Sequence, residues 1–107
     1  MSEVRAFFEG VTAAVDKSKV AGMTATYQFN ITGDDAQVWS VAIANDDVVV
    51  TEGAAEKANI ELTMADADFL ALLKGQLNGQ MAFLTGKLKI KGDMTLAMKL
   101  QSVFKLG

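Results

Sequence analysis

Apolar side chains occupy every second position in two stretches of the chain, and this alternation constrains the fold more than any other feature. In residues 24–31 the apolar positions are Ala25, Tyr27, Phe29 and Ile31, and in residues 37–43 they are Trp39, Val41 and Ile43. Successive side chains of a β-strand point to opposite faces, so each stretch predicts a strand with one buried face. The turn-forming residues between them and the apolar run at 48–51 predict an antiparallel meander.

The segments that flank the meander predict helices and two further strands. Ser2 is placed to cap a first helix with the apolar stripe Val4, Phe7, Phe8, Val11, Ala14 and Val15. Residues 60–64 alternate again and predict a fourth strand, after which Asp66 and Asp68 begin a helix that ends near Gly75. A short apolar stretch at 77–84, a strand at 87–91 and a final helix capped by Asp93 complete the order. These elements fit one α+β domain over residues 1–107.

Composition removes most catalytic chemistry. The chain has no cysteine and no histidine, which excludes thiol nucleophiles, the commonest general base and the commonest transition-metal ligands. Three acidic pairs remain as candidates for acid–base work, but two fall in predicted turns and one at a helix start, where carboxylates have structural roles: Asp34/Asp35, Asp46/Asp47 and Asp66/Asp68. The sequence therefore predicts no catalytic residue, no metal site and no cofactor.

The final helix is apolar around much of its circumference. Met94, Leu96, Ala97, Met98 and Leu100 do not leave the polar back that a one-sided surface helix shows. Such a helix is covered by protein on two sides, or it covers something that is not protein. Methionine lines adaptable apolar surfaces well. Periodicity alone favours ordinary core, and leaves a ligand cavity as the alternative.

Positive charge collects in the last quarter of the chain. Residues 1–83 carry five basic and twelve acidic residues, a net charge of −7, whereas residues 84–107 carry a net charge of +4. Lys87, Lys89 and Lys91 alternate with Leu88 and Ile90. These lysines either protect an exposed sheet edge from pairing or make transient contact with an anionic membrane surface. No nucleic-acid-binding motif accompanies them, so nucleic acid is not an expected partner.

Targeting signals are not evident. No apolar run approaches the roughly 18–20 residues of a membrane span, and the N-terminus lacks the layout of a signal peptide. The C-terminal Lys105-Leu106-Gly107 differs from a peroxisomal Ser-Lys-Leu signal. We therefore expect a soluble, cytoplasmic protein.

Three segments of the second half resemble the sterol carrier protein type 2 family. They are residues 62–72 (LTMADADFLAL), 82–94 (AFLTGKLKIKGDM) and 96–101 (LAMKLQ), in the family's order. The N-terminal half is similar mainly in its order of elements and in Trp39. Asn78-Gly79-Gln80 departs from the Asn-Pro-Gln that many members have at this turn.

The resemblance implies a five-stranded mixed sheet, covered on one face by helices, with a hydrophobic tunnel between the two. It implies non-catalytic binding and carriage of a fatty acid, fatty acyl-CoA, phospholipid or sterol. The alternative is a lipid-presenting or protein-interaction module associated with a separate enzyme. With the apolar pattern it predicts a lipid site at Leu70, Leu73, Leu77, Met81, Phe83, Leu84, Met94, Met98, Val103 and Phe104. Arg5 or a C-terminal lysine is placed to hold a lipid head group.

Overall fold

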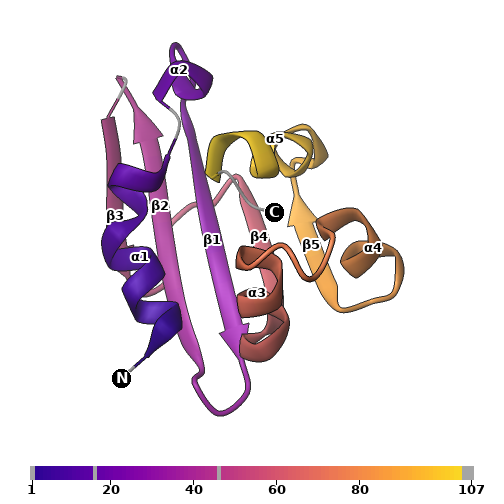
Figure 1. The fold of residues 1–107 in the computed structure, drawn as a ribbon. Coiled ribbons are helices and arrows are strands. Elements are labelled where there is room, and N and C mark those ends of the chain that lie inside the picture. Colours follow the sequence, from indigo (N-terminus) through magenta and orange to yellow (C-terminus); the bar gives the residue numbers. More distant parts are fainter. Residues whose placement is uncertain (1, 16, 46, 105–107) are drawn as a thin grey trace.

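The computed structural model describes residues 2–15, 17–45 and 47–104, which form one sheet with helices packed on it (Figure 1). The elements follow in the order α1 (Glu3–Ala14), α2 (Lys17–Val20), β1 (Ala25–Thr32), β2 (Gln37–Ala44), β3 (Asp47–Glu52), β4 (Ile60–Ala65), α3 (Asp66–Leu73), α4 (Gly79–Leu84), β5 (Leu88–Gly92) and α5 (Met94–Phe104). The strand order is β3-β2-β1-β4-β5. The predicted α+β class and the five-stranded mixed sheet are confirmed.

Only the pairing of β1 with β4 is parallel among the described strands. Phe29 lies opposite Trp39 in β2 and opposite Leu62 in β4, so the apolar positions of neighbouring strands are in register. Partners in register share a face of the sheet. The alternation seen in the sequence thus produces one continuous apolar face, and α1, α3 and α5 lie over it (Figure 1).

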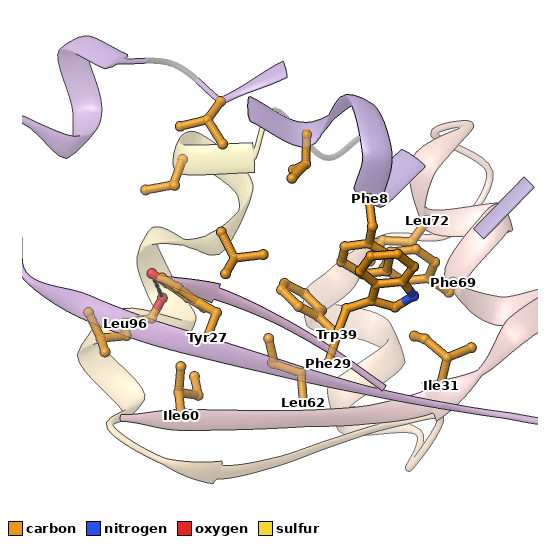
Figure 2. Close-up of a cluster of buried hydrophobic side chains, with 14 of the residues drawn as sticks. Phe8, Tyr27, Phe29, Ile31, Trp39, Ile60, Leu62, Phe69, Leu72 and Leu96 are labelled. Atoms are coloured by element: carbon orange, nitrogen blue, oxygen red, sulfur yellow. Dashed lines mark hydrogen bonds between the residues drawn. The ribbon is translucent and has the colours of Figure 1, made fainter. Parts of the chain in front are cut away.

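An aromatic cluster forms the centre of this core beneath α1 (Figure 2). The Phe8 ring is fully buried and stacks on the Trp39 ring at 5.2 Å between centroids and on the Phe69 ring at 5.5 Å. Phe29 contacts Phe8 from the sheet at 5.2 Å. The cluster therefore joins α1, α3 and the central strands in one packing unit.

The connection from β3 to β4 crosses the outer face of the sheet without a helix. Gln28 and Ser40 are buried polar residues of that face. The Ser40 hydroxyl donates to the Gly53 carbonyl (2.6 Å), and the Gln28 side-chain oxygen accepts from the Ala55 N–H (3.0 Å). These bonds satisfy the crossing backbone and hold it against β1 and β2.

The helix signals in the sequence have the expected local structure. The Ser2 side chain accepts from the Arg5 N–H at the start of α1, and the Asp93 carboxylate accepts from the Thr95 N–H at the start of α5. Gly75 follows α3 with a φ of 74°, the left-handed conformation that ends a helix without strain in glycine.

The segment Lys87–Lys91 was expected to form a strand near a sheet edge, and β5 is an edge strand.

Tyr27 connects the sheet to α5 through a buried hydrogen bond. Its hydroxyl donates to the Leu96 carbonyl at 2.9 Å (Figure 2). Burial, with a smaller contribution from the negative charge of Asp93, raises the pKa of Tyr27 from its ordinary value near 10 to about 12. Above pH 10 the unfolded chain releases this proton while the folded protein retains it, so stability falls as the pH rises.

We expect the free energy of unfolding to decrease by about 2 kcal/mol between pH 10 and pH 12 from this group alone, because the slope stays below its limit of about 1.4 kcal/mol per pH unit at both ends of this range. Urea unfolding of the wild type and of Tyr27→Phe across this range measures the difference, since the variant lacks the titrating group. Tyr27 is the chain's single tyrosine, so phenolate absorbance reports its ionisation directly. A phenolate titration centred near pH 10 in the folded protein would contradict the prediction.

Candidate functional site

An open apolar cavity of about 340 Å³ lies where α4, β5 and α5 meet. Its lining residues come from all three elements and are mostly apolar: Gly79, Gln80, Phe83, Leu88, Ile90, Met94, Ala97 and Met98. This volume falls in the range of roughly 300–1,000 Å³ that small-molecule sites occupy. Gln80 is the one lining residue with a polar side chain, so the space suits a hydrocarbon.

The two helices that enclose the cavity are fixed by caps and by the edge strand between them. The Asn78 side chain accepts from the N–H groups of Gln80 and Met81, and Ala82 of α4 is fully buried. In β5, Leu88 pairs with Met64 and Ile90 pairs with Leu62. These two β5 side chains therefore point to the helix side of the sheet and form the cavity wall, while the intervening lysines point away.

The structure brings three of the ten expected site residues together in this cavity: Phe83, Met94 and Met98. Leu70, Leu73 and Leu77 are half-buried and pack against the hydrophobic core, and Val103 is buried within it. Met81 and Leu84 are exposed on α4, outside the cavity lining. The side chain of Phe104 lies outside the described part of the structure.

Sequence reasoning did not single out Leu88, Ile90 or Ala97, which line the cavity. A signal for the first two was present in the sequence. The same alternation that exposes Lys87, Lys89 and Lys91 turns Leu88 and Ile90 to the other face. Ala97 gave no signal, because a small residue on a largely apolar helix has no preferred neighbour.

Two larger concavities have walls that mix polar and charged side chains with apolar ones. One, of about 620 Å³, lies on the outer face of the sheet and includes Thr26, Ser40, Thr51, Glu56 and Lys57. The other, of about 580 Å³, lies beside the start of α1. Its side chains already bond one another, since Ser2 donates to Asp35 (2.6 Å) and Gln37 donates to both Ser2 and Asp35 (2.8 and 2.7 Å). The α4–β5–α5 cavity is therefore the better site for an apolar ligand.

Arg5 lies away from that cavity and already has a partner. Its guanidinium donates two hydrogen bonds to the Glu52 carboxylate, at 3.1 and 2.7 Å, and lies 5.3 Å from the centre of the Trp39 ring. The bond to Glu52 raises the pKa of Arg5. Helix α1 packs over β2 and β3, whereas the cavity adjoins β5 at the opposite edge of the sheet. Arg5 therefore does not lie at the mouth of this cavity.

Asp35 and Asp66, each a member of one acidic pair, make hydrogen bonds that serve the fold. Hydrogen bonds from Ser2 and Gln37 lower the pKa of Asp35. Asp66 accepts from the N–H of Asp35 (2.8 Å) and the N–H of Ala67 (2.7 Å), which ties the β1–β2 turn to α3. Asp46 lies outside the described residues.

Within the described ranges, no three acidic residues gather to form a metal-binding group. No helix in these ranges is long and apolar enough to cross a bilayer.

Comparison with known proteins gives consistent matches over most of the chain. Human sterol carrier protein 2 is 44% identical over 85 residues, 79% of this chain. Hydroxysteroid dehydrogenase-like protein 2 of Xenopus laevis is 34% identical over 103 residues, 95% of this chain. The chain spans only 16% and 25% of the lengths of these two relatives.

The fold is also that of a solved relative. The solution structure of palmitated SCP2L2 from Aedes aegypti superposes with a TM-score of 0.72 at 25% identity, over 94% of this chain and 91% of that one. The family model described as the SCP-2 sterol transfer family matches residues 6–105. This match covers nearly the whole chain, so the chain belongs to the SCP-2 sterol transfer family.

Proposed function

We propose that this chain binds the hydrocarbon part of a long-chain lipid in the α4–β5–α5 cavity and carries it without catalysing a reaction. The observation that carries the proposal is the apolar lining, in which Phe83, Met94 and Met98 face Leu88 and Ile90 across one open space. The palmitated relative from Aedes aegypti supports a fatty-acyl ligand for this fold. Fatty acids, fatty acyl-CoA, phospholipids and sterols all present hydrocarbon that such a cavity would take from water.

The energetics allow useful affinity without specific recognition of the chain. Each methylene removed from water contributes about 0.8 kcal/mol, so about 16 buried carbons give a gross gain of roughly 12 kcal/mol. Association costs roughly 4–15 kcal/mol, and micromolar binding corresponds to about −8 kcal/mol. One methylene more or less changes the balance little. We therefore expect the carrier to accept long apolar chains of several kinds.

Replacing Met98 with tryptophan tests the site. Met98 lines the cavity and the residue is 82% exposed, so the larger ring has room and should project partly into the ligand space. We expect at least a tenfold weaker affinity for a fluorescent fatty acid, because two or more methylenes lose their place. The free energy of unfolding should change by less than about 1 kcal/mol, in contrast to the 1–3 kcal/mol typical of overpacking in a closed core.

Val49→Trp is the matched control, since Val49 is 58% exposed and lies on the outer face of the sheet. This variant should bind the fatty acid as the wild type does. Weaker binding in Val49→Trp with normal binding in Met98→Trp would place the lipid on the outer face and overturn the assignment. A large stability loss in Met98→Trp without loss of affinity would mean that Met98 is core.

A second function is a lipid-presenting module within an enzyme. What favours it is that the chain matches only a quarter of hydroxysteroid dehydrogenase-like protein 2, a much longer relative. Mass spectrometry of the natively purified protein distinguishes a lipid-holding domain from a pure interaction module. Co-purifying lipid supports both lipid roles, whereas empty protein at equal yield favours the interaction module.

A further inference from the structure

Exposed apolar side chains are concentrated around the cavity mouth. Among the described residues, six large hydrophobic side chains are exposed, and five of them lie on α4 and α5: Met81 (55%), Phe83 (42%), Leu84 (68%), Met94 (48%) and Met98 (82%). The sixth, Val49, lies on β3 at the far edge of the sheet. Single exposed apolar residues are ordinary, but a contiguous group marks an interaction surface.

Positive charge lies along the same edge of the molecule. Lys87, Lys89 and Lys91 are exposed on and beside the edge strand β5, and Lys99 is exposed on α5. Residues 79–99 carry a net charge of +3, whereas the rest of the chain carries six basic and twelve acidic residues, a net charge of −6. No ion pair is found for these four lysines among the described residues.

We propose that this basic edge surface, formed by Met81, Leu84, Met98 and the lysines at 87, 89, 91 and 99, docks on an anionic lipid bilayer. The inference rests on the proposed lipid-carrying function and names the partner from which the cavity is filled. Lysine stems can lie along apolar surface while their ammonium groups reach phosphate or carboxylate head groups. The apolar side chains of α4 and α5 would then enter the boundary between head groups and acyl chains, as those of interfacial helices do.

The geometry directs the cavity toward the membrane. Met98 of this surface also lines the cavity, together with the exposed Phe83 and Met94, so the mouth opens at the apolar part of the surface. Helix α4 lies beyond β5, away from the rest of the sheet (Figure 1). A protein with this charge distribution approaches a negative surface with the β5 edge first, because the remainder of the chain is repelled. A lipid can thus pass between bilayer and cavity without crossing water.

Edge protection is the competing explanation of the lysines. Lysine on an exposed edge strand deters pairing with another chain, and β5 is such a strand. That role needs neither the apolar group on α4 nor an anionic partner. The two explanations therefore differ in whether the lysines and the α4 side chains affect binding to the same vesicles.

Sedimentation with vesicles of phosphatidylcholine containing about one third phosphatidylserine tests the proposal. The wild type should bind them, bind pure phosphatidylcholine at least tenfold more weakly, and dissociate as salt is raised. Replacing Lys87, Lys89 and Lys91 by glutamine should weaken binding by about fivefold for each lysine. Met81→Ser with Leu84→Ser should weaken it at least tenfold, while fatty-acid affinity measured without vesicles stays unchanged, because neither residue lines the cavity.

The matched controls are Lys57→Gln and Val49→Ser, which remove a lysine and an exposed apolar side chain outside the basic edge surface. Both should bind vesicles as the wild type does. Equal losses in the controls, or wild-type binding that ignores phosphatidylserine, would overturn the proposal. Aggregation of the glutamine variant with unchanged vesicle binding would assign the lysines to edge protection. In every such case, retained fatty-acid binding in solution leaves the proposed function intact.

Discussion

Replacing Phe8 with alanine is expected to lower the free energy of unfolding by about 3–5 kcal/mol. The Phe8 ring is fully buried and stacks between Trp39 and Phe69, with interplanar angles of 10° and 5°. Its removal leaves a cavity bordered by three aromatic rings that are held by separate elements, so the site cannot collapse to fill it. Domains of this size are stabilised by about 5–15 kcal/mol in total, so the loss is a large fraction.

Urea unfolding followed by tryptophan fluorescence measures the effect, and Trp39, the single tryptophan, lies against the altered position. Phe7→Ala is the matched control. Phe7 is only half-buried and meets Phe8 and Phe69 edge-on, at 5.1 and 5.5 Å between ring centroids. It should lose clearly less stability than Phe8→Ala. Equal losses in the two variants would mean that the stacked cluster is not the centre of the core.

Phe8→Ala should leave fatty-acid affinity unchanged in the fraction that is folded. Helix α1 packs over β2 and β3, while the cavity adjoins β5. The aromatic cluster, over the central strands, and the cavity, at the β5 edge, thus occupy different parts of the sheet. This separation lets one side of the domain supply stability while the other keeps apolar side chains exposed.

The strands could be predicted because one face of the sheet is buried and the other is not. Tyr27, Phe29 and Ile31 reveal β1 by alternation alone, and β5 shows the same signal in Lys87–Lys91. Capping residues such as Ser2 and Asp93 similarly marked helix starts, since their side chains bond the first N–H groups. These signals depend only on residues close together in the sequence, so the strands and helix starts can be predicted without knowing the rest of the fold.

The directions of side chains on the final helices could not be read from the sequence. In α5, Leu96 is buried while Met94 and Met98 are exposed, yet all three look alike on a helix that is apolar on several sides. Their environments depend on where α4 and β5 pack, which is a long-range result. The pairing of Arg5 with Glu52 is also long-range, since 47 positions separate the two residues. The cavity was therefore predictable as a region, but only in part as a set of residues.

Replacing Gly92 with alanine is expected to lower the free energy of unfolding by about 3 kcal/mol or more, with loss of lipid binding. Gly92 has a φ of 117°, a conformation that strains any residue with a Cβ atom. An added Cβ would also lie 2.9 Å from the Ile60 Cα and closer still to the Asn59 carbonyl oxygen. Steric overlap of this kind adds to the strain unless the strand moves.

Asn59 cannot move aside, because it is bonded on both sides. Its N–H donates to the Thr26 carbonyl (3.0 Å), its side-chain oxygen accepts from the Thr26 N–H (2.7 Å), and its carbonyl accepts from the Asp93 N–H (3.0 Å). The end of β5 must therefore shift. Because α5 begins at Met94, the shift separates Met94 and Met98 from the cavity wall on β5.

Gly86→Ala separates the two causes. Gly86 also has a positive φ, of 81°, but no atom lies within 4 Å of an added Cβ. It should lose only about 1–2 kcal/mol, with little change in fatty-acid affinity. Fatty-acid titration at a temperature where both variants are folded should show at least a tenfold loss for Gly92→Ala alone. If the two variants behave alike, the close contact with Asn59 does not position α5, and the cavity is held together by other contacts.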